Sequence, residues 1–139
     1  MSDDRIKRLQ EKYPGAETFS FGDTPDLNAE LLDLVITGQK TATCGALRDF
    51  QDGQEALPVV GRRDIVLGPD GAPAAVIETR QVQIRKFTEV DDAFARDEGE
   101  GDRTLESWRR MHRAYFARNG GFDPEMQLVC ERFVLVEVL

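Results

Sequence analysis

The last segment of the chain, residues 127–139, limits most strongly what this sequence can fold into. Its apolar side chains fall on both alternating sets of positions, and within residues 128–136 only Glu131 and Arg132 break the apolar run. A strand that is apolar on both faces belongs inside a sheet or barrel. Glu131 and Arg132 are costly to bury unless they are paired or hydrogen-bonded. We therefore expect a central strand, and either a polar cavity or structural partners for these two side chains.

Two segments have the pattern of amphipathic helices. At residues 25–37, Thr24 is a suitable N-cap, Pro25 occupies the first helical position, and leucines recur at helical spacing up to Gly38. The second helix is expected to end at residues 119–121. Its apolar face is predicted from Leu105, Trp108, His112, Tyr115 and Phe116. Shorter helices are predicted near residues 2–12 and 90–95.

The remaining regular segments have the pattern of strands. We predict strands at residues 40–44, 64–67 and 73–87, with the longest bent near residues 79–81, and loops at residues 48–58 and 88–103. Strands interrupted by helices without regular βαβ spacing favour an α+β fold over a doubly wound sheet. The length of 139 residues fits a single domain.

The charge balance restricts the partners. A net charge of −8 argues against non-specific binding to duplex DNA, because such binding needs clustered basic residues. No apolar run is long enough to span a bilayer, and residues 1–5 lack the apolar core of a secretory signal. Cys44 and Cys130 form no CxxC pair, so we expect reduced core thiols in a cytoplasmic protein without a membrane partner.

Lys40 is the first candidate for chemistry. It stands just after a helix end and just before a strand. It could be a solvated lysine at the helix dipole, or a partly desolvated ammonium that binds an anion or loses its proton. In a regular strand, Lys40 and Thr43 would lie on opposite faces, so a bend is needed before they can meet.

The acidic segment 97–102 is the second candidate. Its two glycines between acids could make a loop that supplies a general acid or base, or oxygen ligands for a metal ion. Its spacing does not match an EF-hand. The simpler alternative is a helix-entry loop in which Asp102 or Thr104 is the N-cap.

The other candidates are weaker. His112 is the only histidine, which excludes two-histidine acid–base catalysis and histidine-cluster metal sites, and its position favours a packed core residue. The arginines of residues 109–118 could contact phosphate or form a solvated face. The sequence contains no P-loop, GxGxxG or GxSxG motif. We expect no cofactor and no resident metal.

Two segments are specific enough to suggest a family: Gly38-Gln39-Lys40-Thr41 and Glu98-Gly99-Glu100-Gly101-Asp102. Through them, and from about residue 21 to its end, the chain resembles the ASCH domain family, which includes small bacterial proteins. The other matching segments are residues 21–25, 31–35, 42–44, 76–79 and 129–133. The resemblance implies a PUA-like mixed or antiparallel β-barrel surrounded by helices. It also implies one ASCH domain over residues 1–139, with a helical extension at 1–18 and a core at 19–139.

The resemblance also implies a function on RNA or modified nucleosides. Some small relatives look like amidohydrolases of acetylcytidine, and another is described as a single-strand ribonuclease. Carried over by position, the catalytic set is Lys40, Thr43 and Glu98, with Glu100 as the alternative acid. The residues expected to bind the ligand are Thr41, Arg48, Trp108, Glu131 and Arg132.

Three functions follow as hypotheses. The first is a hydrolase of acylated cytidine, in which Thr43 attacks the amide, Lys40 is its base, and Glu98 or Glu100 assists. The second is a non-catalytic module for single-stranded RNA, with basic residues on phosphate and Trp108 stacking on a base. The third is a ribonuclease assisted by a metal ion held in the acidic loop. The sequence does not predict the oligomeric state.

Overall fold

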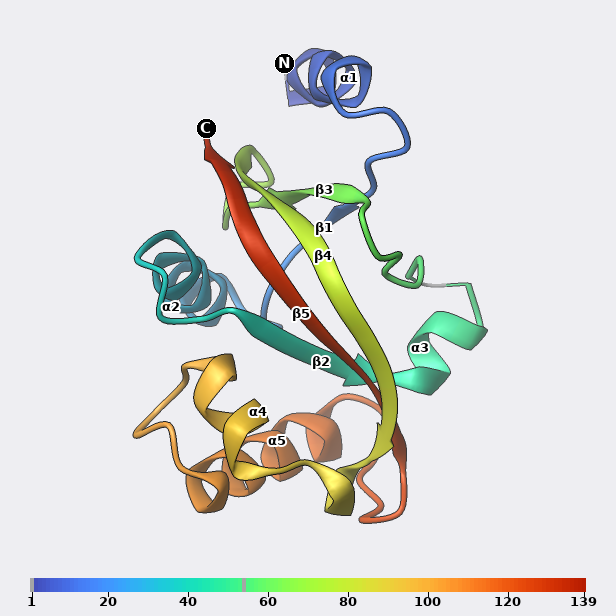
Figure 1. Cartoon of the computed structure of the whole chain (residues 1–139), viewed down its shortest axis with the longest axis vertical. Coiled ribbons are helices and arrows are strands. Elements are labelled where there is room, and N and C mark those ends of the chain that lie inside the picture. The colour runs from blue at the N-terminus through green and yellow to red at the C-terminus, as the bar shows by residue number, and fades with distance from the viewer. Residues whose placement is uncertain (1, 54) are drawn as a thin grey trace.

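The computed structural model describes residues 2–53 and 55–139, which form a curved sheet with helices around it (Figure 1). The elements in chain order are α1 (Ser2–Lys12), β1 (Thr18–Phe19), α2 (Pro25–Ile36), β2 (Ala42–Ala46), α3 (Leu47–Gln51), β3 (Arg63–Leu67), β4 (Pro73–Lys86), the 3₁₀ turn η1 (Phe87–Glu89), α4 (Asp92–Glu98), α5 (Leu105–Arg118) and β5 (Gln127–Val138).

The sheet has the strand order β1-β3-β4-β5-β2. The short β1 runs parallel to β3, and the other three pairs are antiparallel. The register between β4 and β5 shifts between Thr79 and Gln81, which is the predicted bend. Because β4 and β5 are long and β2 pairs with only the first part of β5, the sheet offers two distinct regions for the helices to cover (Figure 1).

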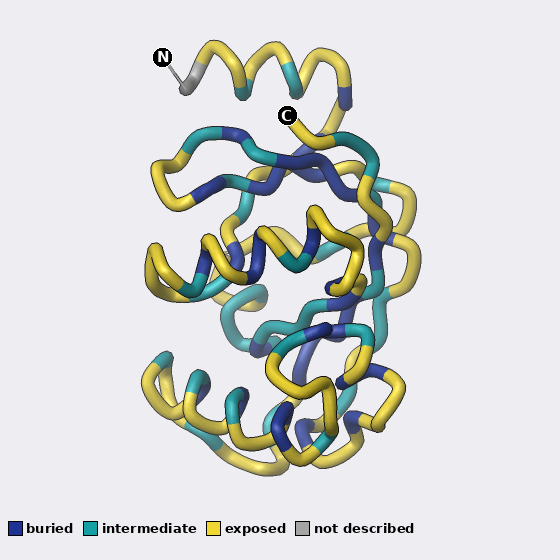
Figure 2. The backbone as a smooth tube through the Cα atoms, turned by 90° about the vertical axis from the view of Figure 1, so that its left-hand side faces the viewer, coloured by how far each residue is buried: buried dark blue, intermediate teal, exposed yellow. Residues whose placement is uncertain are grey.

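Three apolar clusters hold the elements together. The first packs η1, α4 and α5 under β2 and the start of β5 around Trp108 and Phe116, and the second packs α2 around Val35 against β3, β4 and β5. A third, smaller cluster places Tyr13 at the end of α1 against Ile65 and its neighbours. Figure 2 shows that burial is concentrated in the strands and inner helix faces, whereas most of α1 is exposed.

The two long helices begin where the capping residues predict. Thr24 accepts a hydrogen bond from the backbone N–H of Leu27 at 3.1 Å, and Thr104 accepts one from Ser107 at 3.2 Å. Each cap satisfies a backbone N–H that has no partner inside its helix. The predicted helices at 2–12 and 25–37 are confirmed to within one residue, and the second long helix, expected to end at residues 119–121, ends at Arg118.

Other boundaries were predicted wrongly. Residues 47–51 form the short helix α3 rather than a loop, and no side chain caps its start, so the sequence carries no signal for it. Strand β2 begins at Ala42, which leaves Lys40 in the connection before the strand. Helix α4 extends to Glu98, so part of the acidic segment is helical.

The expectation for the last strand holds only for its first half. Residues 128–133 are mostly buried, whereas Val134, Leu135 and Val138 are 39%, 37% and 53% exposed. The reason is pairing: β2 covers β5 only as far as Arg132, and beyond that point β5 is an edge paired with β4 alone. Cys44 and Cys130 are register partners across β2 and β5 and remain free thiols. No helix in the described part of the chain is long and apolar enough to cross a membrane.

Candidate functional site

A fully buried ammonium group is the centre of the site. Lys40 is 1% exposed, and its Nζ donates to Glu98 Oε1 at 2.7 Å and to Glu100 Oε2 at 2.9 Å. The same nitrogen donates to the backbone oxygen of Ala42 at 2.8 Å. Burial of a charge is costly unless it is compensated, and here two carboxylates and a carbonyl supply the compensation.

Backbone contacts bring the two segments of this cluster together. The N–H of Thr41 donates to the oxygen of Asp97 at 2.7 Å, and the side chain of Gln39 donates to the oxygen of Gly99 at 2.7 Å. Gly99 has a φ of 76°, and a Cβ there would lie 2.6 Å from the oxygen of Gln39. Only glycine permits this approach, which places the end of α4 directly against the residues before β2.

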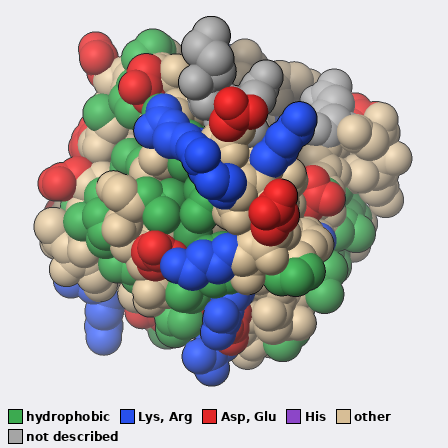
Figure 3. Space-filling model, turned by 90° about the horizontal axis from the view of Figure 1, so that it is seen from above, with side chains coloured by type: hydrophobic (Ala, Val, Ile, Leu, Met, Phe, Trp, Pro, Cys, Tyr) green, Lys and Arg blue, Asp and Glu red, His purple; other side chains and the backbone are tan. Residues whose placement is uncertain are grey.

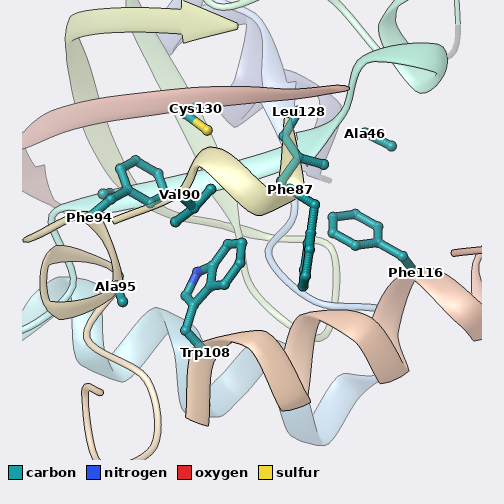
Figure 4. Close-up of a cluster of buried hydrophobic side chains, with 10 residues drawn as sticks. Ala46, Phe87, Val90, Phe94, Ala95, Trp108, Phe116, Leu128 and Cys130 are labelled. Atoms are coloured by element: carbon teal, nitrogen blue, oxygen red, sulfur yellow. The ribbon is translucent and has the colours of Figure 1, made fainter. Parts of the chain in front are cut away.

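Glu98 is held from its other side by α5. Its Oε2 accepts from the indole Nε1 of Trp108 at 3.0 Å and lies 3.4 Å from Nε2 of His112. The imidazole of His112 stacks on Trp108 with ring centres 4.2 Å apart. Trp108 itself is 2% exposed, inside the cluster of Phe87, Val90 and Phe94 (Figure 4). Trp108 therefore positions Glu98 and does not present a ring to solvent.

The charges of the cluster support one another. Burial lowers the pKa of Lys40, but the charges of Glu98 and Glu100 raise it more, so the pKa lies above its usual value and the lysine stays protonated. Burial raises the pKa of Glu98, but Lys40 and His112 bring it well below its usual value. Burial together with the charge of Glu98 leaves the pKa of Glu100 raised. Burial lowers the pKa of His112, and Glu98 raises it above its usual value.

This cluster forms part of the wall of a cavity of about 1060 Å³. Thr43, Glu98, Glu100, His112 and Glu131 all line it. The strand β2 thus brings Thr43 to the same space as the carboxylates that hold Lys40. The predicted need for a bend is met because Lys40 precedes the strand and turns its ammonium back to Ala42.

The other walls are aromatic and aliphatic. Phe19, Phe21, Phe50 and Tyr115 line the cavity, and Phe50 comes from the unpredicted helix α3. The ring of Phe50 packs over Gly45, where a Cβ would lie 3.1 Å from the ring. A glycine at this position of β2 therefore makes room for the ring beside the cavity.

Glu131 is a second buried acid at this cavity. It is 8% exposed and accepts a hydrogen bond of 2.5 Å from the hydroxyl of Thr79. Burial raises the pKa of Glu131 to about 7. It is also the register partner of Thr43 across β2 and β5, and such partners project to the same face of a sheet. Near neutral pH, an exchangeable proton is therefore present beside Thr43.

The lining of the cavity is acidic. Among the described lining residues, seven are carboxylic acids: Glu17, Asp49, Glu55, Asp64, Glu98, Glu100 and Glu131. The two arginines in the lining are both engaged: Arg62 donates to Asp64 at 2.8 Å and Arg118 to Asp23 at 2.7 Å. Asp23 accepts hydrogen bonds from Arg118 and Asn119, which lower its pKa to about 2. Such a cavity suits a neutral or cationic ligand better than a phosphate.

The predicted site residues divide into two groups. Thr43, Glu98, Glu100 and Glu131 line the cavity, with Lys40 directly behind the two glutamates that it bridges. Thr41, Arg48, Trp108 and Arg132 are not among the lining residues. Thr41 is exposed next to Asp97, and Arg48 donates to the backbone oxygens of residues 119 and 121. Arg132 donates to Asp97 and Gln81.

Sequence reasoning missed two side chains that the structure brings to the cluster. His112 was expected to be a packed core residue, and it is buried, but it also faces Glu98 and the cavity. Its position four residues after Trp108 was the available signal, because side chains at that spacing share a helix face. Cys44 was expected to be a core thiol, and its sulfur lies within 4.8 Å of ligand atoms of Glu98 and His112. Nothing in the local sequence connects Cys44 with the other two.

Comparison with known proteins identifies the family. The family model for the ASCH domain matches residues 17–137. A sequence search of curated proteins gives no significant match. Among solved structures, protein EF3133 of Enterococcus faecalis V583 is 31% identical with a TM-score of 0.84, covering 99% of this chain and 88% of its own. An ASCH domain of Lactobacillus crispatus JV V101 is 30% identical with a TM-score of 0.81, covering 93% of this chain and 84% of its own.

A more distant ASCH protein of Zymomonas mobilis, solved as a mutant protein, is similar in fold alone. It is 12% identical with a TM-score of 0.53, covering 88% of this chain and 67% of its own. The α+β fold with its mixed, mostly antiparallel sheet agrees with these neighbours and confirms the PUA-like expectation. The chain belongs to the ASCH domain family.

Proposed function

We propose that this ASCH protein is a hydrolase of small acylated nucleosides, with acetylcytidine as its model substrate. The observation that carries the proposal is the Lys40–Glu98–Glu100 cluster, buried at the wall of a large cavity that Thr43 also lines. A nucleophile, an ionisable acid and a fixed cation at one cavity are components that amide hydrolysis needs.

The residues at the cavity divide the chemistry among them. Thr43 supplies the hydroxyl that attacks the amide carbonyl. Glu100 has a side chain that is 15% exposed against 1% for Glu98, so it is the acid within reach of substrate and takes the hydroxyl proton. Glu100 then gives this proton to the departing amine, and water hydrolyses the resulting threonyl ester. Lys40 stays charged and holds both carboxylates in place, in contrast to the neutral base expected from the sequence.

The cavity favours a nucleoside over an RNA chain. Its volume of about 1060 Å³ slightly exceeds the usual range for small-molecule sites, about 300–1,000 Å³, so the cavity has room for a nucleoside. Phe50 and Tyr115 line the cavity, and aromatic side chains are the ones on which nucleic-acid bases stack. Both arginines of the lining are paired with acids, so neither is free to bind phosphate.

The RNA-binding alternative has less support. Arg48 and Arg132, two of the residues expected to bind the ligand, are engaged in structural hydrogen bonds, and Trp108 is buried. On the face of the molecule seen in Figure 3, Lys and Arg side chains alternate with Asp and Glu. A contiguous basic surface, which the phosphates of RNA require, does not appear on that face.

Turnover of acetylcytidine to cytidine and acetate, followed by chromatography, tests the proposal. We expect Thr43→Val to reduce kcat at least about a thousandfold and Glu100→Gln to reduce it about 10²–10⁴-fold, since each removes a group that acts on the reacting atoms. The matched controls are Thr88→Val and Glu30→Gln, both exposed and outside the cavity lining, and they should retain wild-type turnover. No turnover of acylated cytidines by the wild-type protein, or full turnover by Thr43→Val, would refute the proposal.

A further inference from the structure

Three ligand atoms of different chemical type converge beside the cluster of Lys40. The sulfur of Cys44, a carboxylate oxygen of Glu98 and a ring nitrogen of His112 all lie within 4.8 Å of one another. They come from β2, the end of α4 and the middle of α5, so the fold itself brings them together. We propose that Cys44, Glu98 and His112 bind one divalent transition-metal ion, with zinc as the favoured ion.

The hydrogen bond of His112 Nδ1 directs Nε2 toward the other two ligand atoms. Its Nδ1 lies 2.9 Å from the backbone oxygen of Trp108. A carbonyl oxygen can only accept, so Nδ1 carries a proton and Nε2 bears the lone pair in the neutral ring. A backbone oxygen that fixes the tautomer in this way is a regular outer partner of metal-binding histidines. Nε2 faces Glu98 at 3.4 Å, which is the side on which Cys44 also lies.

The carboxylate of Glu98 is also oriented for a single metal bond. Lys40 occupies Oε1 at 2.7 Å, which leaves Oε2 as the ligand atom. The indole of Trp108 donates to Oε2 at 3.0 Å and so fixes its direction, while a carboxylate oxygen retains a second lone pair for a metal. The expected coordination is therefore one sulfur, one nitrogen and one oxygen.

This donor set favours zinc among the common ions. Thiolate and imidazole together suit zinc and related transition metals, whereas magnesium and calcium prefer oxygen ligands alone. All three residues line the cavity, so a fourth coordination position would open toward it. Three protein ligands with one open position are typical of catalytic rather than structural zinc sites. The acidic lining of the cavity further favours a cation.

The site was invisible in the sequence because its members are distant from one another. Histidine clusters are excluded by the single histidine, and the acidic segment 97–102 contributes only Glu98. The inference goes beyond the proposed hydrolase, whose assigned steps use Thr43 and Glu100 and need no metal.

Cobalt(II) is the probe for the test, because a cobalt–thiolate bond gives a charge-transfer absorption in the near ultraviolet. The protein is freed of metal under reducing conditions and titrated with Co²⁺. We expect one equivalent to bind with this absorption and with visible bands typical of tetrahedral coordination, and we expect Zn²⁺ to displace it. Trp108, the only tryptophan, stacks on His112, so its fluorescence should change in the same titration.

Cys44→Ala should remove the charge-transfer absorption and weaken Co²⁺ binding at least about tenfold, since loss of even an outer partner costs about 10–100-fold. Cys130→Ala is the matched control, because it removes the neighbouring thiol on β5 and should leave the titration unchanged. His112→Gln provides a second variant with an intact Cys44, and it should weaken binding to a similar degree.

No saturable Co²⁺ absorption in the wild-type protein would overturn the metal site, as would an unchanged titration of Cys44→Ala or His112→Gln. Because the readout is binding, its result is separate from the hydrolase test. A metal-binding protein that leaves acylated cytidines intact refutes the hydrolase alone. A metal-free protein that turns them over, and takes up no Co²⁺, refutes the metal site alone.

Discussion

Lys40 shows what a single buried charge requires of its surroundings. Its ammonium has two carboxylate partners and one carbonyl partner within 3.0 Å, and the residue is 1% exposed. The side chain of Glu98 is also 1% exposed, and its charge is compensated by the same ion pair with Lys40. Buried ion pairs contribute little net stability, but removal of one partner strands the other in a medium that does not solvate it. The site is therefore sensitive to truncation of any of its charged members.

Lys40→Ala should lower the free energy of unfolding by about 3–5 kcal/mol, because it leaves Glu98 charged, buried and without its cation. Urea denaturation measures this change. Lys86→Ala is the matched control: Lys86 pairs with Glu125 at 3.2 Å, but both side chains are about half exposed, so its loss should cost at most about 1 kcal/mol. Equal losses in the two variants would contradict the assignment of Lys40 as a buried, compensated charge.

Glu131 makes stability depend on pH. Its pKa is raised from 4.5 to about 7 in the folded protein, so the folded state binds more protons than the unfolded state between these values. Stability should then fall as pH rises from 4.5 through 7. Glu131→Gln removes this titration, and the variant should gain on the order of 3 kcal/mol over wild type between pH 4.5 and pH 8. Thermal or urea unfolding at pH 5 and pH 8 tests this, and parallel pH profiles of the two proteins would contradict it.

The contact between the end of α4 and the residues before β2 builds the site at the scale of elements. Gly99 and Gly38 both have a positive φ, of 76° and 87°, but only Gly99 faces neighbouring backbone. Gly38→Ala should cost about 1–2 kcal/mol, the usual penalty of an alanine in the left-handed conformation. Gly99→Ala should cost about 1–3 kcal/mol more, because its Cβ would lie 2.6 Å from the oxygen of Gln39.

Denaturation of both glycine variants measures the difference, and activity on acetylcytidine provides a second comparison. Gly99→Ala should also impair turnover, since it shifts Glu98 and Glu100 away from Lys40, whereas Gly38→Ala should retain it. Similar stabilities for the two variants would show that the close approach of the two segments is not needed.

The elements were predictable where local chemistry defines them. Helices α2 and α5 have hydroxyl caps and periodic apolar faces, so the sequence alone predicts their positions. Helix α3 spans only five residues and has no capping side chain, so no local signal distinguishes it from a loop. The exposed end of β5 was unpredictable for another reason: its burial depends on where β2 stops, which is a property of the sheet and not of β5.

At the scale of the whole molecule, a net charge of −8 and an acidic cavity make salt dependence a direct test of ligand class. A neutral nucleoside releases no counterions on binding, so its affinity should change less than about twofold between about 50 and 200 mM salt. An RNA oligonucleotide should not compete with it. Binding titrations of the nucleoside at the two salt concentrations measure this. An RNA oligonucleotide that binds, with an affinity that falls tenfold or more over the same range of salt, would favour the RNA-binding alternative.

The site was predictable only in part, because its members come from separated parts of the sequence. Lys40, Thr43, Glu98 and Glu100 were named from the resemblance to the family, and whether they act together stays a prediction. Local patterns could not reveal that Arg48 and Arg132 are held by backbone and by Asp97, or that Trp108 turns its indole toward Glu98. Contacts between residues that are distant in the sequence decide these orientations, and such contacts leave no local sequence pattern.

The separation between Lys40 and Glu98 also has a consequence for the timing of assembly. The two residues are 58 positions apart, so Lys40 is synthesised before either carboxylate partner and stays a solvated amine until both have joined the fold. During that interval its amine is open to acylating reagents, and closure of the fold then protects it. The extent to which Lys40 is acylated would therefore report how far a nascent chain has completed the site.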